Sequence, residues 1–167
     1  MKRGGLLRRT SIRRRAPSRG GLMDADRAYL KFLHRVVVML RAGAALFIQG
    51  EQWMWRGRCL KCRMERWLQV SHICPKGEYR ALEFDPANAF ALCWRCHMHW
   101  WHKNPEEARR WAIGVMGQAA WDRLWLRARV ASRPDWKAVT LALAIECEQM
   151  APGLLPSRNR KDSAGGA

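Results

Sequence analysis

Two pairs of cysteines constrain the fold of this 167-residue chain more than any other feature. Cys59 and Cys62 form one C-x2-C unit, and Cys93 and Cys96 form a second one, 30 residues further along the chain. Two residues between thiolates let a tight turn aim both sulfur atoms at one ion, and two such turns complete a tetrahedral site. Reduced structural thiols and disulfides are the alternatives, and the lack of a secretory signal disfavours disulfides. The spacing therefore predicts a structural Zn²⁺ held by four cysteines.

Histidines cluster directly after the second cysteine pair, where His97, His99 and His102 lie within six residues. On an α-helix His97 and His102 would be about 140° apart around the axis, so they share an ion only if the helix is irregular there. His99 and His102 are three residues apart, which is geometrically easier. The sequence leaves open which pair meets a metal. Cys74 and Cys147 have no partner at metal-site spacing, and we expect ordinary thiols there.

Apolar periodicity and turn residues predict an α+β fold that is mostly helical. Asn104-Pro105-Glu106-Glu107 is typical of a helix start, with a polar cap, a proline at the first position and acids in the first turn. We expect helices from Asp24 to about Ile48, from Cys93 or Trp94 to before Pro105, and over 105–117, 118–130 and 136–150, with strands over 67–73 and 89–92. The expected division is a disordered basic arm (1–22), an N-terminal helix (23–50), a ββα zinc core (51–105), a helical scaffold (106–150) and a disordered tail (151–167).

Positive charge is the other dominant feature. The chain has 31 Lys and Arg against 14 Asp and Glu, which gives a formal charge of +17 at pH 7. This excess indicates a polyanionic partner, with nucleic acid ahead of an anionic membrane surface. Residues 1–20 hold eight basic and no acidic residues and too few large apolar ones to fold alone. We interpret them as a phosphate-binding arm, with a solubilising tail as the alternative. No apolar run approaches the roughly 18 residues that span a bilayer, so we expect a soluble cytoplasmic protein.

The order of these motifs resembles the HNH endonucleases with a zinc-knuckle frame, in particular the phage recombination endonucleases of the NinG/Rap type. The basic opening Arg8-Arg9-Thr10 also resembles the start of such proteins. The main resemblance covers residues 57–105, and beyond the first C-x2-C unit it is carried by Ser71-His72-Ile73-Cys74-Pro75-Lys76-Gly77, Asp85-Pro86-Ala87-Asn88, Leu92-Cys93-Trp94-Arg95-Cys96-His97 and Trp101-His102-Lys103-Asn104-Pro105.

The resemblance implies a ββα-metal nuclease that cuts DNA and leaves 5′-phosphate and 3′-hydroxyl ends. His72 would be the general base, and Asn88 would hold its ring through a hydrogen bond. His97 would bind a catalytic Mg²⁺ or Mn²⁺, with His102 as the second ligand, while the four cysteines would hold the structural zinc. Ser71 departs from the family pattern, because many members place an aspartate or histidine there as a metal ligand. This departure favours the alternative of a zinc-stabilised, non-catalytic DNA-binding accessory protein, and an RNA-binding zinc-knuckle protein is a third interpretation.

The expected partner is DNA, with branched and single-stranded DNA as the candidate forms, in a bacterial host cell that carries a phage or prophage. We expect selectivity for DNA structure over sequence, because no sequence-reading motif is recognisable. A dimer would suit a branched substrate, but no heptad or apolar stripe requires one. The candidate phosphate contacts are basic residues of the arm and of the zinc core: Arg8, Arg9, Arg13, Arg14, Arg15, Arg58, Lys61, Arg63, Lys76 and Arg80.

Overall fold

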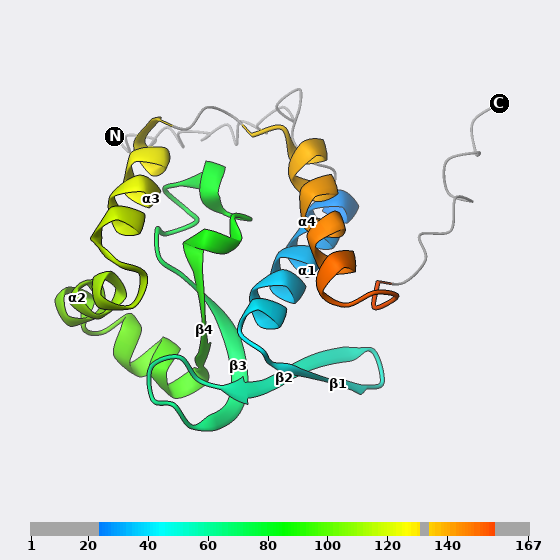
Figure 1. Ribbon diagram of the computed structural model, residues 1–167, viewed down its shortest axis with the longest axis horizontal. Coiled ribbons are helices and arrows are strands. Elements are labelled where there is room, and N and C mark those ends of the chain that lie inside the picture. Colours follow the sequence, from blue (N-terminus) through cyan, green and yellow to red (C-terminus); the bar gives the residue numbers. More distant parts are fainter. Residues whose placement is uncertain (1–23, 131–133, 156–167) are drawn as a thin grey trace, which may run out of the picture.

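The computed structural model describes residues 24–130 and 134–155, which form an α+β fold with a four-stranded antiparallel sheet (Figure 1). The strands are ordered β1-β2-β3-β4, as in the sequence. The basic arm and residues 156–167 of the tail lie outside the described residues. The elements are α1 (Asp24–Arg41), β1 (Ala45–Gln49), β2 (Gln52–Arg58), β3 (Glu65–His72), two 3-10 turns (Arg80–Leu82 and Pro86–Asn88), β4 (Ala89–Cys93), the π-helix η3 (Arg95–Trp101), α2 (Pro105–Met116), α3 (Gln118–Val130) and α4 (Trp136–Met150).

The first helix ends earlier than its apolar periodicity predicts, and the expected helix over residues 42–48 is wrong. Gly43 adopts a left-handed conformation (φ 65°), its N–H bonds the carbonyl of Leu40, and the N–H of Ala44 bonds that of Met39. This pattern is a Schellman motif, which stops an α-helix. The next residues form β1, which pairs with β2 as a hairpin. Phe47 and Ile48 are aromatic and β-branched residues that favour this extended state.

The two predicted strands and the three C-terminal helices are confirmed. The strand expected over 67–73 is β3, and the one expected over 89–92 is β4. The helix that follows Asn104 begins at Pro105 and ends before Gly117, as predicted, but the expected polar cap is absent, because the Asn104 side chain donates to the carbonyl of Trp100. The helix expected from Cys93 or Trp94 is present as well, but residues 95–101 of it are π-helical.

α1 covers one face of the sheet and closes the core. Leu30, Leu33 and Val37 are fully buried on the helix, and they join the buried side chains of Trp55 and Leu68 from β2 and β3. Helix α4 lies beside α1 (Figure 1).

The loop after α1 and the segment after α4 both pack closely against the sheet and core. A Cβ atom on Gly57 would lie 3.0 Å from the Cα of Ala44, so glycine allows the loop after α1 to reach the sheet. The expected disordered tail over 151–167 begins too early. Its first residues, 151–155, pack on the protein, since Leu154 and Leu155 are partly buried against the core. No helix within the described ranges is long and apolar enough to cross a membrane.

Candidate metal centre and histidine cluster

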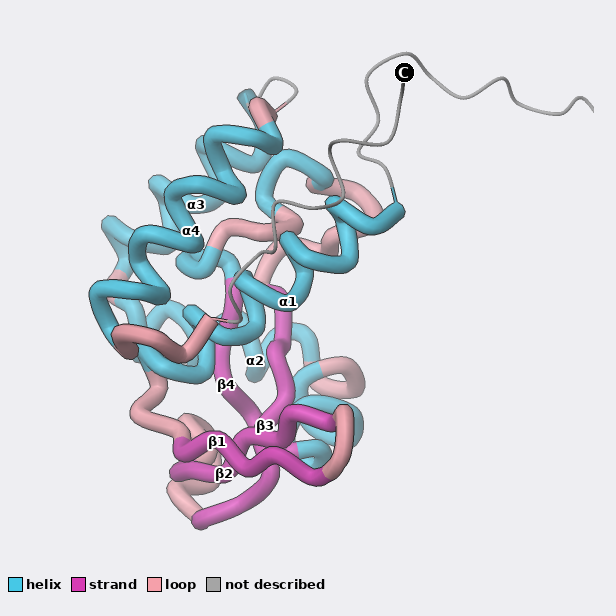
Figure 2. The backbone as a smooth tube through the Cα atoms, turned by 90° about the vertical axis from the view of Figure 1, so that its right-hand side faces the viewer, coloured by secondary structure: helices cyan, strands magenta, loops and turns pink. Residues whose placement is uncertain are grey.

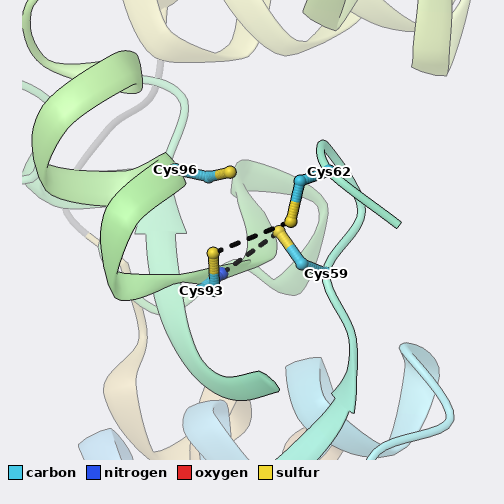
Figure 3. A group of neighbouring side chains, drawn as sticks. All are labelled: Cys59, Cys62, Cys93 and Cys96. Carbon is cyan, nitrogen blue, oxygen red and sulfur yellow. Dashed lines mark hydrogen bonds between the residues drawn. The ribbon is translucent and has the colours of Figure 1, made fainter. Parts of the chain in front are cut away.

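The four cysteines of the two C-x2-C units converge on one point, as their spacing predicts (Figure 3). Their sulfur atoms all lie within 4.8 Å of one another, and the sulfur atoms of Cys62 and Cys93 are 3.9 Å apart. Zn–S bonds of about 2.3 Å at tetrahedral angles place sulfur atoms about 3.8 Å apart, so the cluster has the size of a zinc site. Cys59, Cys93 and Cys96 are buried and Cys62 is exposed. All six cysteines are free thiols, and Cys74 and Cys147 lie apart from the cluster.

Electrostatics within the cluster favour a thiolate at one position. Burial acts to raise the pKa of Cys59, but backbone hydrogen bonds, led by the one from the Cys93 N–H at 3.2 Å, lower it to about 7. The thiolate is the form that binds a metal. Burial raises the pKa of Cys74 to about 11, so that thiol stays protonated at neutral pH. Burial also raises the pKa of Cys93 and Cys96, so Cys59 is the member of the cluster whose surroundings favour the thiolate.

The π-helix decides which histidines face one another. A π-helix takes more residues per turn than an α-helix, so residues five apart come onto the same side. The rings of His97 and His102 lie 4.9 Å apart between centroids. His99 instead packs its ring edge-to-face against Trp94, with centroids 4.6 Å apart. The geometrically easier pair of the sequence analysis, His99 and His102, is therefore not the pair that the structure brings together.

His97 is oriented for binding through one nitrogen. Its Nδ1 lies 3.0 Å from the side-chain oxygen of Gln69 on β3, which makes Nδ1 the donor and leaves Nε2 with a free lone pair. Burial lowers the pKa of His97, and repulsion from His102 and His72 lowers it further. Both effects favour the neutral imidazole, which is the form that ligates a metal.

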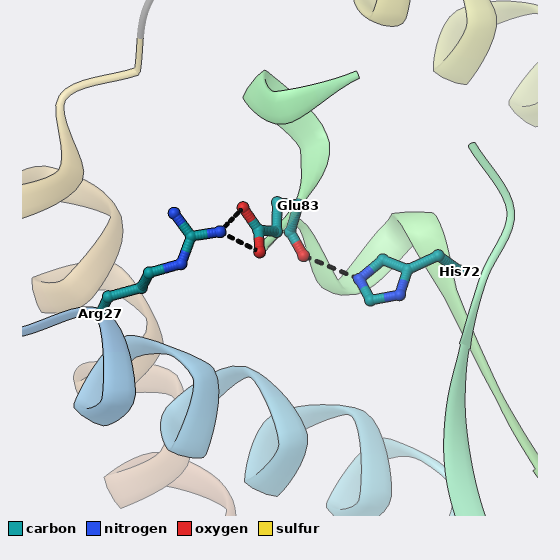
Figure 4. Close-up of polar contacts among 3 residues, drawn as sticks. All are labelled: Arg27, His72 and Glu83. Carbon is teal, nitrogen blue, oxygen red and sulfur yellow. Dashed lines mark hydrogen bonds and ion pairs between the residues drawn. The ribbon is translucent and has the colours of Figure 1, made fainter. Parts of the chain in front are cut away.

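His72 ends β3, and its ring is fixed by a backbone carbonyl (Figure 4). Nε2 donates to the carbonyl oxygen of Glu83 at 2.9 Å, so Nδ1 is the nitrogen that can accept a proton. Burial lowers the pKa of His72, which keeps the ring neutral at physiological pH. The Glu83 carboxylate is itself held by Arg27 of α1, whose guanidinium lies 2.7 Å from both carboxylate oxygens. Arg27 and Glu83 were not identified from the sequence, because neither belongs to a motif.

Asn88 does not hold the His72 ring as expected, because it makes no hydrogen bond to that ring. Its fully buried side chain instead forms hydrogen bonds with the backbone of the loop between β3 and β4. Its side-chain oxygen accepts from the Cys74 N–H at 2.7 Å, and its side-chain nitrogen donates to the carbonyls of Cys74 and Leu82. Leu82 precedes Glu83, so Asn88 positions the carbonyl that holds His72. Its link to His72 is therefore indirect.

His34 of α1, which belongs to no motif, is buried and packs against the partly buried His72. The rings of His34 and His72 are stacked with centroids 5.5 Å apart, and His34 is 3% exposed with no hydrogen-bond partner at Nε2. Burial lowers the pKa of His34 to about 4. The signal was available, because position 34 lies one turn from Leu30 and Val37 on the apolar face of the helix.

The candidate DNA contacts of the core occupy different environments. Arg58 is exposed at the end of β2, and Arg63 is exposed in the turn before β3 with a φ of 62°. Lys76 lies close enough to His72 to lower the pKa of that histidine, and Arg80 is exposed in the same loop. Arg58 and Arg63 directly flank the first C-x2-C unit in the sequence, and Lys76 and Arg80 belong to the loop that follows His72. The arm residues Arg8, Arg9, Arg13, Arg14 and Arg15 lie outside the described residues.

Lys61 is already engaged with the protein. Its ammonium group lies 4.0 Å from the ring centroid of Trp100 and 3.4 Å from a carboxylate oxygen of Glu107. A cation–π contact combined with an ion pair holds the side chain on the protein surface near α2. The structure therefore gives Lys61 a packing role at the first C-x2-C unit.

A groove of about 960 Å³ opens beside the histidine pair. His102 and Trp101 form its wall on one side, and side chains of α2 and α3, including Arg109 and Arg123, form the other. The groove therefore makes His102 accessible to a substrate group, and Arg109, Arg123 and Arg129 line the same groove.

Comparison with protein-family models, with curated proteins and with solved structures found no match for this chain. The fold and the cysteine cluster define an α+β protein with a four-cysteine site compatible with zinc. For the histidine cluster, the geometry of His97 and His102 is the available guide to function.

Proposed function

We propose that this protein is a metal-dependent HNH-type endonuclease that hydrolyses phosphodiester bonds of DNA. The observation that carries the proposal is the approach of the His97 and His102 rings to each other at η3, within electrostatic range of His72. Two strands, β3 and β4, followed by a helix that starts at a four-cysteine cluster, fit the order of a ββα-metal core. The resemblance of residues 57–105 to the phage NinG/Rap-type enzymes points in the same direction.

The side chains divide the chemistry among themselves. His72 is the general base: its Nε2 is occupied by the Glu83 carbonyl, so Nδ1 takes the proton of the attacking water. His97 and His102 fit a divalent ion such as Mg²⁺ or Mn²⁺, because both are accessible imidazoles and Gln69 orients the first of them. Such an ion, when bound, polarises the phosphate and stabilises the leaving oxygen. The four cysteines hold a structural zinc that fixes β4 and η3 against the turn after β2.

DNA is the proposed substrate because the chain carries a charge of +17 and the described basic residues Arg58, Arg63, Lys76 and Arg80 lie around the site. Such contacts hold phosphates without reading bases, so we propose selectivity for DNA structure over sequence. An enzyme of this kind would act in the cytoplasm of a bacterial host.

The test is a cleavage assay with supercoiled, single-stranded and branched DNA in the presence of Mg²⁺ or Mn²⁺. Wild-type protein should nick at least one substrate, and His72→Ala should lower the rate by about 10² to 10⁴, the usual contribution of a general base. His99→Ala is the matched control, because His99 lies on the same helix but packs against Trp94. Titration of Mn²⁺, followed by electron paramagnetic resonance, should show weaker binding for His97→Ala and His102→Ala than for His99→Ala. The proposal is wrong if wild type and His72→Ala cleave nothing, or cleave alike.

One observation favours a second function, a zinc-stabilised DNA-binding protein without cleavage. Ser71 stands where many HNH enzymes have a metal ligand, and its hydroxyl is fully buried without a hydrogen-bond partner. A buried serine cannot add a ligand to the histidine pair. In this alternative, wild type and His72→Ala bind DNA equally and neither cleaves it.

A further inference from the structure

The outer face of the sheet carries an aromatic and basic surface away from the cysteine cluster. The register pairs Arg56 of β2 with both Ala45 of β1 and Trp67 of β3. Because side chains alternate along a strand, Phe47, Arg56, Trp67 and Gln69 point to the same side of the sheet. We call these four residues the outer sheet face.

This face is open to solvent. Phe47 is 44% exposed and Trp67 is 49% exposed, although their rings contact one another edge-to-face with centroids 5.4 Å apart. The opposite face of the sheet packs under α1, where Trp55 is buried and Trp53 contacts Phe32. The β1–β2 hairpin lies at the lower end of the molecule in Figure 2, away from α3 and α4. Two large aromatic rings on an exposed face of a charged protein indicate a binding surface.

The charges around the rings suit a nucleic-acid strand. Arg56 is exposed on β2, between the strands that carry Phe47 and Trp67, and Arg58 is exposed two residues further along. Guanidinium groups attract phosphates, and aromatic rings stack on bases. Bases in a duplex are already stacked and offer no free face, so rings in this position select unpaired nucleotides.

The outer sheet face leads directly to the histidine pair. Gln69 lies two residues after Trp67 on β3, about 7 Å along the strand, and its side chain bonds His97. We infer that the outer sheet face binds unpaired nucleotides of a DNA strand whose neighbouring phosphate lies at His97 and His102. This inference rests on the proposed function, because it makes the face the part of the substrate site that recognises single-stranded or branched DNA.

The test measures binding separately from cleavage. Full-length protein carrying His72→Ala is titrated into fluorescein-labelled single-stranded DNA and into the matching duplex, and anisotropy is followed. Adding Trp67→Ala should weaken binding to the single strand about tenfold and binding to the duplex less than twofold, since stacking requires a free base. Trp67→Phe keeps a ring and should retain most of the affinity, whereas Trp67→Leu should behave like alanine. Leu141→Ala removes a 62% exposed apolar side chain from α4 and is the matched control, with unchanged binding.

The outcomes separate this inference from the proposed function. If Trp67→Ala and Trp67→Leu bind single-stranded DNA like their parent, or lose single strand and duplex equally, the inference is wrong whatever the cleavage assay shows. It is also wrong if the alanine variant turns a dimer into a monomer with unchanged DNA affinity, because the face would then bind a second copy. If selective loss occurs and wild type still cleaves nothing, the face is confirmed and the endonuclease proposal fails. Zinc content and far-UV circular dichroism of each variant verify that it is folded.

Discussion

His34 should make the stability of this protein strongly dependent on pH. Burial lowers the pKa of His34 to about 4, whereas an unfolded histidine has a pKa of 6.5. Below pH 6.5 the unfolded chain therefore binds a proton that the folded chain excludes. Each pKa unit corresponds to 1.36 kcal/mol, so the difference amounts to about 3 kcal/mol. This stability is fully present above pH 6.5 and is lost as the pH falls from 6.5 to 4, with about 2 kcal/mol already lost at pH 5.

The assay is urea unfolding in the presence of zinc at pH 7, 6 and 5, followed by tryptophan fluorescence. Protonation of the zinc-binding thiolates and of carboxylates also changes the stability, so the informative quantity is the difference between wild type and His34→Gln, whose side chain does not titrate. Wild type should lose about 2 kcal/mol more than His34→Gln between pH 7 and pH 5. His99→Gln, which removes an exposed histidine, should follow wild type. Equal losses for wild type and His34→Gln would refute the reasoning, because the burial cost would then fall elsewhere.

Three further predictions address the site. Because burial lowers the pKa of His72, the cleavage rate should be flat from pH 7 to 8 and should fall only below pH 6.5, as the base becomes protonated; a rate still rising above pH 7 would contradict this. Asn88→Ala leaves three buried backbone groups of the loop unpaired and should lower the free energy of unfolding by about 3 kcal/mol in urea unfolding; a loss below about 1 kcal/mol would show that the clasp is dispensable. Metal analysis should find one zinc per chain in wild type and in Cys74→Ser, and a loss of zinc and of thermal stability in Cys62→Ser or after chelation; equal zinc in both variants would remove the four-cysteine site.

The elements that the sequence predicts well are those with a local chemical signal. The helix starting at Pro105 has a proline at its first position and acids in its first turn, and its bounds are confirmed, although the Asn104 side chain donates to the Trp100 carbonyl and does not cap the helix. The four cysteines meet because C-x2-C turns are local and the antiparallel strands bring the second turn beside the first. The β1–β2 hairpin was missed because Leu46, Phe47 and Ile48 continue an apolar pattern, and the decisive signal was the single glycine at position 43. Helix periodicity alone cannot mark a Schellman stop.

The candidate site was predictable in its residues but not in its contacts. His72, His97 and His102 stand out by type and spacing, whereas the hydrogen bond from the His72 ring to Glu83 depends on how the loop after β3 folds back. A backbone carbonyl has no sequence signature, because any residue at position 83 would supply one. The same reason explains Asn88. It was expected to bond the His72 ring, but it bonds the carbonyl of Leu82, next to the Glu83 carbonyl that accepts from the ring.

The π-helix connects the two clusters. Cys93 ends β4 two residues before η3, Cys96 and His97 lie in η3, and His102 directly follows it, so one irregular helix joins the cysteine cluster to both candidate ion ligands. In an α-helix five residues would turn His102 about 140° away from His97, and the easier pair would be His99 and His102. A π-helix is costly and is rarely kept without a local cause. The pairing of His97 with His102, and of His99 with Trp94, is such a cause if an ion binds between the first two. On this argument, zinc at the start of η3 and a second ion along it would stabilise the same irregular turn, so binding at either site should favour binding at the other.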